Sequence, residues 1–410
     1  MSLCIAMVAG EASGDLLAAH LIAALKQHLP DARFVGIGGT KMEMQGFDAW
    51  WPAEKLSVRG YVEVLRHYRE ITGIRRDLLS RLLREKPDVF IGVDAPDFNL
   101  WLEQRLKARG IPAIHYVSPS VWAWRGGRIR KIARAVTHML ALFPFEPALY
   151  RKQEVPVTYV GHPLADVIPL VIEKKAARER LDIEGAAPVF ALLPGSRQSE
   201  LQAMAELFIE TAQKLAGRFP DARFLVPLTT RETRNQFEEA LWKCGAQEML
   251  DNASPKLASF AAPRGGGDGA LGQPGGAIKL MFGHAQDALA AADVALVASG
   301  TATLETALIK TPLVIAYRMS PWSWRLMRRM RYQPWVGLPN ILAGRFVVPE
   351  FLQDDATADN LAQALGNLYA DRQVREKLRQ VFTEIHTTLR QNTSAKAAAA
   401  ILPYLGRAAA

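Results

Sequence analysis

Residues 3–15 read LCIAMVAGEASGD, an unbroken apolar run that passes directly into a turn of glycine, small and acidic residues. The run Leu3–Val8 predicts a strand buried on both faces, because strands with one face in water alternate apolar and polar residues. A helical pattern then extends from Asp15 to Leu29. A buried strand, a glycine turn and a helix in this order indicate the first unit of a parallel α/β sheet.

This alternation repeats along the chain. In the first half we expect strands at Arg33–Ile37, Asp88–Val93, Ala113–Val117, His138–Leu142 and Val157–Val160. The pattern stops after Gly161-His162-Pro163, and further strands are expected at Pro188–Leu193, Phe224–Pro227, Val294–Ala298 and Pro312–Ala316. We therefore predict two Rossmann-like, doubly wound α/β domains, residues 1–165 and 173–356, followed by a helical C-terminal tail, residues 357–410.

One stretch departs from the pattern. Residues 252–277 contain Gly265-Gly266-Gly267 and Pro274-Gly275-Gly276 but few large apolar side chains. Such a composition buries too little surface to offset the entropy lost on ordering, so we predict a flexible surface insertion within the second domain.

The composition fits an enzyme of the cytoplasm. Of 410 residues, 49% are hydrophobic and 22% charged, which is ordinary for a globular protein. The two cysteines, Cys4 and Cys244, are too few for a disulfide framework and are expected to be reduced thiols. No signal-peptide pattern precedes the first strand, and no apolar stretch is long enough to span a bilayer. We expect a cytoplasmic protein.

The net charge of +9 is concentrated in two windows. No acidic residue lies between Glu103 and Glu146 or between Arg318 and Glu350, while both windows contain several arginines. Such windows suit an anionic partner, which includes phosphates, nucleic acid and anionic lipid surfaces. Solvated basic faces without any partner are the alternative, and the sequence leaves it open.

Two turns in the first half place carboxylates at predicted strand ends, where open α/β sheets bind their ligands. In Gly10-Glu11-Ala12-Ser13-Gly14-Asp15 the glycines let the backbone approach a ligand, and the following helix directs its dipole toward it. In Asp94-Ala95-Pro96-Asp97-Phe98 a carboxylate held by a proline turn is suited to be a general base. A structural turn for the first segment, and a helix N-cap for the second, remain open.

Two turns in the second half have the composition of a diphosphate site. Gly195-Ser196-Arg197 offers helix-start amides, a hydroxyl and a guanidinium, and Ser299-Gly300-Thr301 occupies the same position after another strand. Glu305, one helical turn further on, is placed to accept the ribose hydroxyls of a nucleotide. Helix caps are the alternative for each turn alone, whereas the pair favours a nucleotide diphosphate.

The segment 322–335 combines tryptophan with arginine, a mixture that suits a lipid headgroup layer. Its candidate membrane-facing residues are Trp322, Trp324, Arg325, Arg328, Arg329 and Trp335. A subunit or domain interface has a similar composition and stays open. No Cys/His cluster or HExxH spacing occurs anywhere in the chain, so we expect neither a metal nor another cofactor.

Taken together and in order, these segments resemble the lipid-A-disaccharide synthase family of inverting glycosyltransferases. The matching motifs run from residue 3 to about residue 353 and are Gly10–Asp15, Asp94–Phe98, Ser118–Trp124, Val160–Pro163, Leu193–Arg197, Ser299–Glu305 and Leu338–Asn340. Each motif is weak alone, and the ordered set is specific. The insertion at 252–277 lies between motifs.

The resemblance implies the GT-B architecture, in which two lobes face an interdomain cleft and a C-terminal helix packs back on the first lobe. It implies condensation of UDP-2,3-diacylglucosamine with 2,3-diacylglucosamine 1-phosphate (lipid X) to the β-1,6-linked disaccharide 1-phosphate and UDP. It also implies peripheral attachment to the cytoplasmic face of the inner membrane of a Gram-negative bacterium, without nucleic acid. A homodimer is an assembly that we keep open.

Residue roles follow from the same resemblance and from a single-displacement mechanism. Asp97 is our first candidate for the general base, with Glu11 and Asp15 behind it. Arg197 neutralises the diphosphate, and Glu305 binds ribose. Four further residues are expected near the cleft with their roles open: Ser13, Gly14, His162 and Asn340.

Two other functions compete with this one. A UDP-sugar epimerase of the same fold needs the nucleotide site but no lipid-facing surface. A basic nucleic-acid-binding protein would account for the arginine windows. That second alternative leaves the glycine turns and the strand-end carboxylates without a role.

Overall fold

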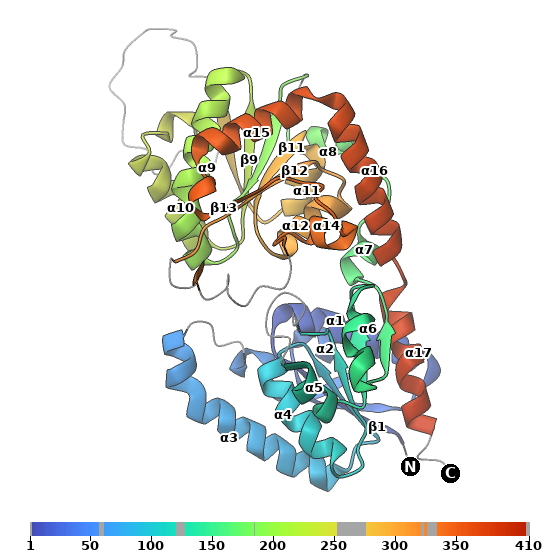
Figure 1. Cartoon of the computed structure of the whole chain (residues 1–410). Coiled ribbons are helices and arrows are strands. Elements are labelled where there is room, and N and C mark those ends of the chain that lie inside the picture. The colour runs from blue at the N-terminus through green and yellow to red at the C-terminus, as the bar shows by residue number, and fades with distance from the viewer. Residues whose placement is uncertain are drawn as a thin grey trace. The chain divides into compact units, whose positions relative to one another are not determined.

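The computed structural model describes residues 2–56, 61–119, 128–183, 185–251, 276–320, 324–325 and 334–406, with the backbone alone for residues 61–68. The chain divides into two compact units. The first is built mainly from Met1–Val167 and Thr388–Ala410, and the second from Ile168–Arg329 and Gln333–Thr387. Each unit is an open sheet of parallel strands with helices packed on it, which confirms the predicted fold class (Figure 1).

The sheet of the first unit has seven strands in the order β3-β2-β1-β4-β5-β6-β7. The strands are β1 (Cys4–Ala9), β2 (Arg33–Gly38), β3 (Phe47–Pro52), β4 (Val89–Val93), β5 (Ala113–Tyr116), β6 (His138–Ala141) and β7 (Val157–Tyr159). Its helices before the second unit are α1 (Ala12–His28), α2 (Thr40–Glu43), α3 (Tyr61–Glu85), α4 (Pro96–Lys107), α5 (Ile129–Ala135), α6 (Glu146–Tyr150) and α7 (Pro163–Val167).

Strand β1 is apolar at every position because helices cover both of its faces. Ile5 and Met7 pack in a core with α1 and the C-terminal helix α17 (Thr393–Leu405), whereas Ala6 and Val8 pack in a second core with α3 and α4. Successive side chains of a strand point to opposite faces, so helices on both faces require apolar residues throughout. The continuous run at the start of the chain is therefore the signature of a doubly covered strand.

The sheet of the second unit has six strands in the order β10-β9-β8-β11-β12-β13. They are β8 (Val189–Leu193), β9 (Arg223–Leu228), β10 (Ala277–Phe282), β11 (Val294–Ala298), β12 (Leu313–Tyr317) and β13 (Glu350–Leu352). The helices are α8 (Lys174–Arg180), α9 (Gln198–Arg218), α10 (Arg231–Lys243), α11 (Ala285–Ala291), α12 (Thr301–Leu308), α14 (Leu338–Ala343), α15 (Ala358–Ala370) and most of α16 (Arg372–Leu389).

The predicted insertion needs one correction at its end. Residue 277 was expected to belong to it, but Ala277 is the first residue of β10, and Gly276 before it is buried. A side chain at Gly276 would lie 2.7 Å from the Ala216 side chain, so this glycine is packed against α9. Residues 252–275 lie outside the described residues.

The tail is helical, as predicted, and it consists of three helices: α15, α16 and α17. Helix α17 packs against α1 and adds Ala397, Ala398 and Ile401 to the core of the first unit. Asp166 fixes its start, because this carboxylate accepts the backbone N–H groups of Gln391, Asn392 and Thr393 at 3.1, 2.9 and 2.7 Å. Among the described helices, none is long and apolar enough to cross a bilayer.

Both sheets reverse their strand order beside their first strand. In the first unit the chain proceeds from β1 to β2 and β3 on one side, and then returns to place β4 on the other side of β1. In the second unit β8 and β11 have the same relation. Ligands of open α/β sheets bind at the carboxyl ends of the strands that flank such a reversal. Four of the motifs, Gly10–Asp15, Asp94–Phe98, Leu193–Arg197 and Ser299–Glu305, are located at these two places.

Candidate active site

In the first unit, the two predicted carboxylate turns lie side by side. Ala9 and Val93, the last residues of β1 and β4, are partners in the parallel ladder. A side chain on Gly10 would come within 3.2 Å of the Ala95 side chain, so the turns after β1 and β4 pack closely together. Glu11 and Ser13 are exposed on this edge, and Glu11 makes no capping hydrogen bond to α1. Glu11 and the Asp94–Asp97 turn therefore follow neighbouring strand ends at one edge of the sheet.

The turn after β4 has an unusual backbone. Asp94 and Ala95 have φ angles of 53° and 43°, in the left-handed region that residues with a side chain rarely adopt. Such conformations cost on the order of 1–3 kcal/mol each and gather at functional sites. Asp94 was quoted as part of this motif but not singled out from the sequence. It is the first residue beyond the strand, and only its backbone conformation distinguishes it.

Asp97 lies in the first turn of α4 with an exposed carboxylate. Its side chain is 83% exposed and forms an ion pair with Arg128, and its main-chain carbonyl accepts a hydrogen bond from Arg75 at 3.4 Å. An exposed carboxylate next to guanidinium groups can reach a solvent-borne substrate hydroxyl. It also keeps an arginine close to any anionic group of that substrate.

The carboxylate of Asp15, unlike that of Asp97, is bonded to backbone amides. This residue is buried, and its carboxylate accepts the backbone N–H groups of Gly39, Lys41 and Met42 at 2.9, 3.0 and 3.1 Å. A side chain at Gly39 would lie 2.7 Å from Asp15 Oδ2, which explains the glycine at this position. Asp15 thus holds the start of α2, while the neighbouring Gly14 is buried beside Val93.

In the second unit, the first diphosphate-type turn follows β8. Gly195 has a φ of 129° and leads into α9. The N–H groups of Ser196 and Arg197 donate to the Glu200 carboxylate at 3.1 and 3.3 Å, and Arg197 Nη1 lies 3.4 Å from the same carboxylate. Ser196 and Arg197 are exposed. These contacts form a capping box at the start of α9, so the helix-cap alternative applies to this turn, whose backbone amides face an anionic oxygen.

The second diphosphate-type turn follows β11, the neighbour of β8, with Val297 and Leu193 as ladder partners. Gly300 has a φ of 109°, and α12 starts at Thr301 with both residues exposed. Glu305 is half-buried on α12 and accepts a hydrogen bond from Gln286 at 3.0 Å. The two turns and Glu305 therefore lie at the reversal point of one sheet, as their positions in the sequence suggested.

Two residues whose roles the sequence left open are part of the framework. The amide of Asn340 is fully buried and bonds to the backbone of Val347 and Val348 and to Glu350 at 2.7–2.9 Å. His162 is buried, its ring stacks on Phe143, and Nδ1 accepts the N–H of Leu164 at 3.3 Å. Burial lowers the pKa of His162 to about 4, although Asp166 opposes this shift.

The tryptophan–arginine segment is only partly described. Trp324 and Trp335 are half-buried and Arg325 is exposed, whereas Trp322, Arg328 and Arg329 lie outside the described residues. Within the described part of the chain, no three His, Cys, Asp or Glu side chains converge as a metal site would require.

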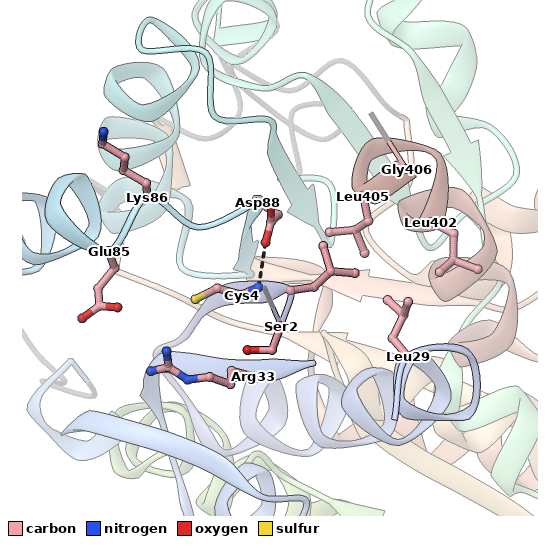
Figure 2. Close-up of a pocket in the computed structure, with 11 residues that line it drawn as sticks. Ser2, Cys4, Leu29, Arg33, Glu85, Lys86, Asp88, Leu402, Leu405 and Gly406 are labelled. Carbon is pink, nitrogen blue, oxygen red and sulfur yellow. Dashed lines mark hydrogen bonds between the residues drawn. The ribbon is translucent and has the colours of Figure 1, made fainter. Parts of the chain in front are cut away.

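A cavity of about 1010 Å³ lies at the other end of the first sheet (Figure 2). Its walls include Cys4, Arg33 and Asp88, which stand at the amino ends of β1, β2 and β4, together with Leu402 and Leu405 of α17. None of the predicted site residues lines it. The Gly10–Asp15 and Asp94–Phe98 motifs follow the opposite, carboxyl ends of β1 and β4, where the strand order reverses.

Known proteins of one family match this chain over almost its whole length. A family model described as lipid-A-disaccharide synthetase matches residues 5–260 and 276–402. The lipid-A-disaccharide synthase of Dechloromonas aromatica is 62% identical, over 98% of both chains. That of an Azoarcus species is 58% identical, over 99% of this chain and 97% of its own, and that of Burkholderia mallei is 49% identical over 97% and 95%.

Solved structures show a similar fold at low sequence identity. A UDP-GlcNAc 2-epimerase from Neisseria meningitidis bound to UDP-GlcNAc superimposes with a TM-score of 0.61 at 12% identity, over 99% of this chain and all of its own. A glycosyltransferase from Rickettsia africae gives 0.57 at 12% identity, over 99% of both chains. These likenesses show the fold alone. The relatives in sequence do not favour the epimerase alternative.

The lowered pKa of His162 predicts a pH-dependent stability. Between pH 6.5 and about 4 the unfolded chain binds a proton at this imidazole and the folded chain does not, so stability is lost as the pH falls through this range. His162→Gln should remove about 2 kcal/mol of the stability difference between pH 7 and pH 5. Urea unfolding at both pH values measures it, with His28→Gln at an exposed position as the control. An unchanged pH dependence in His162→Gln would contradict the burial argument.

Proposed function

We propose a specific reaction for this chain, which belongs to the lipid-A-disaccharide synthase family and is a glycosyltransferase. It transfers 2,3-diacylglucosamine from its UDP ester to the 6-hydroxyl of 2,3-diacylglucosamine 1-phosphate. The products are the β-1,6-linked disaccharide 1-phosphate and UDP. The observation that carries this proposal is the pair of glycine turns at the strand reversal of the second sheet, one with amides that already bind a carboxylate.

The second unit binds the UDP portion of the donor. A diphosphate presents several anionic oxygens, and the Gly195–Arg197 and Ser299–Thr301 turns offer amides, hydroxyls and one exposed guanidinium on adjacent strand ends. Such preorganised donors stabilise the charge that grows on the leaving diphosphate more than the charge of the bound donor. Glu305 accepts hydrogen bonds from the ribose hydroxyls, with Gln286 fixing one carboxylate oxygen.

The first unit supplies the general base from the turns after β1 and β4. Asp97 is the first choice because its exposed carboxylate can reach a substrate hydroxyl. Asp94 enters as a second candidate because of its left-handed backbone at the strand end. Glu11 is the third candidate for the base. Asp15 is a positioning residue, since three backbone amides already occupy its carboxylate.

The reaction is a single displacement at the anomeric carbon of the donor. The base takes the proton of the 6-hydroxyl as the oxygen forms its bond to the anomeric carbon on the face opposite UDP. The bond between that carbon and the diphosphate oxygen breaks with its electron pair going to UDP. The configuration therefore inverts. No covalent intermediate or redox step is needed.

Attachment to the cytoplasmic face of the inner membrane is also part of the proposal. Both substrates have acyl chains, and the arginine windows suit an anionic headgroup layer. Sedimentation with vesicles containing anionic phospholipid tests this attachment. Recovery of the protein in the supernatant at low salt would contradict it.

The function itself is tested with purified protein, UDP-2,3-diacylglucosamine and lipid X. We expect UDP release that depends on lipid X, continues in EDTA and yields the disaccharide 1-phosphate by mass spectrometry. UDP release without lipid X, or formation of an epimerised UDP-sugar, would contradict the transferase assignment.

The base is tested by isosteric amides at the β4 turn. Asp97→Asn should lower kcat by roughly 10²–10⁴, the usual share of general base catalysis, while the donor KM changes little. Asp94→Asn is the matched comparison from the same turn, and Asp77→Asn at an exposed position of α3 is the control. Retained turnover in Asp97→Asn together with a loss in Asp94→Asn moves the role to Asp94. Retained turnover in both variants would show that this turn does not supply the base.

The ribose contact is tested at Glu305. Glu305→Ala should raise the donor KM roughly 10- to 100-fold, because a hydrogen bond to a charged group contributes about 1.5–3 kcal/mol. Glu305→Gln, which keeps the size and one acceptor, should lose less. The measurement is a titration of the donor and, separately, of free UDP by calorimetry. Parental UDP affinity in Glu305→Ala would show that ribose binds elsewhere.

A further inference from the structure

A buried polar group lies beneath the turn after β4. Asn99 and Glu103 stand on α4 four residues apart, which places them on one helix face. Glu103 Oε1 is 2.7 Å from Nδ1 of His115 on β5. All three side chains are fully buried. A carboxylate and an imidazole in contact inside the sheet–helix core are unusual, because charged groups are rarely buried completely.

Asn99 connects this group to the turn. Its side-chain Nδ2 donates to the main-chain oxygen of Asp94 at 2.8 Å, and the oxygens of Val93 and Val8 lie at 3.5 and 3.4 Å from the same nitrogen. One amide thereby reaches the carboxyl ends of both strands that flank the reversal, β1 and β4. It also holds the peptide between the two left-handed residues Asp94 and Ala95.

Strand β4 has a glycine where the side chains of Glu103 and Asn99 approach it. Gly92 is the second-last residue of β4 and pairs with His115 in the ladder. A side chain at Gly92 would lie 2.2 Å from Glu103 Oε1 and 2.9 Å from the Asn99 Cβ. Glycine inside a strand is unfavourable and often marks a close approach by another group. Here the approaching groups are Glu103 and Asn99.

Stability alone does not account for the arrangement. Burial raises the pKa of Glu103, with the neighbouring His115 opposing the shift, so the charged carboxyl is disfavoured inside the core. Glu103 Oε2, His115 Nε2 and Asn99 Oδ1 have no hydrogen-bond partner among the described residues. Well-packed apolar side chains in place of a buried ion pair are often neutral or stabilising. A polar group kept here at this cost points to a requirement other than stability.

We propose that Asn99, Glu103 and His115 form a positioning network that sets the backbone of the Asp94–Asp97 turn for catalysis. His115 fixes Glu103, the side chains of Glu103 and Asn99 both lie over Gly92, and Asn99 holds the Asp94 peptide in its left-handed conformation. The three residues lie beneath the turn and touch no substrate, so they are not catalytic residues. The inference rests on the proposed function in one respect, namely that this turn supplies the base.

Two substitutions test the network from different directions. Glu103→Gln keeps the size of the side chain and one acceptor but replaces the carboxyl group by an amide. Gly92→Ala changes no polar side chain, but its new methyl displaces Glu103 and Asn99. Both should lower kcat roughly 10- to 100-fold with donor and acceptor KM within about threefold, because small misplacements of a catalytic group cost this much. Glu103→Ala should lose more than Glu103→Gln.

The matched control is His138→Gln. His138 is a partly buried imidazole of the first unit, held by Tyr404 and Thr158 at 2.9 and 2.8 Å, away from the turn. We expect this variant to lower the melting temperature with kcat unchanged. A kcat within threefold of the parent in folded Glu103→Gln and Gly92→Ala would overturn the proposal, and so would an equal loss in His138→Gln.

A second readout does not depend on catalysis. Amide hydrogen exchange of a peptide spanning residues 93–99 should be faster in Glu103→Gln and Gly92→Ala than in the parent and His138→Gln. Unchanged exchange in this peptide would overturn the proposal. If the parent released no UDP from the two acyl sugars, the proposed function would fail, and the exchange result alone would decide whether the network holds the turn.

Discussion

Both sheets of this protein are parallel and covered by helices on both faces, and this constraint decides where chemistry can occur. A strand such as β1 must be apolar at every position, as Ile5 to Val8 show by packing alternately into two cores. Polar side chains are therefore displaced to the turns. Where the strand order reverses, two such turns come from adjacent strands, and this happens once in each unit, at β1/β4 and at β8/β11.

The turns are held by carboxylates and amides from within the framework. Asp15 binds three backbone N–H groups at the start of α2, Asp166 binds three at the start of α17, and Glu200 binds two at the start of α9. Helix starts carry unsatisfied donors, so an anionic oxygen is the natural partner. In the proposed donor site, the backbone amides of Ser196 and Arg197, which bind the Glu200 carboxylate, also bind the diphosphate oxygens of the nucleotide. One physical rule thus explains both the scaffold and the proposed donor site.

Much of this could be predicted from the sequence, because strand type and turn position follow from side-chain period. The continuous run before Gly10 indicated a doubly covered strand, and the turns containing Gly195 and Gly300 were placed correctly at strand ends. The edge strand β3 was not predicted, since Phe47–Pro52 is half-exposed and mixes aromatic residues with aspartate and proline. The role of Asp15 depends on backbone amides 24–27 residues away in the sequence. That of Asn340 depends on the conformation of the loop before β13. The periodicity of the sequence reveals neither.

The proposed reaction requires that the reversal point of the second sheet is the nucleotide site. A crystal structure of the protein with UDP tests this most directly. We predict that the diphosphate oxygens lie within hydrogen-bond distance of the Gly195–Arg197 and Ser299–Thr301 turns, with the ribose hydroxyls on Glu305. UDP bound at another place, such as the cavity at the amino ends of β1 and β2, would contradict it.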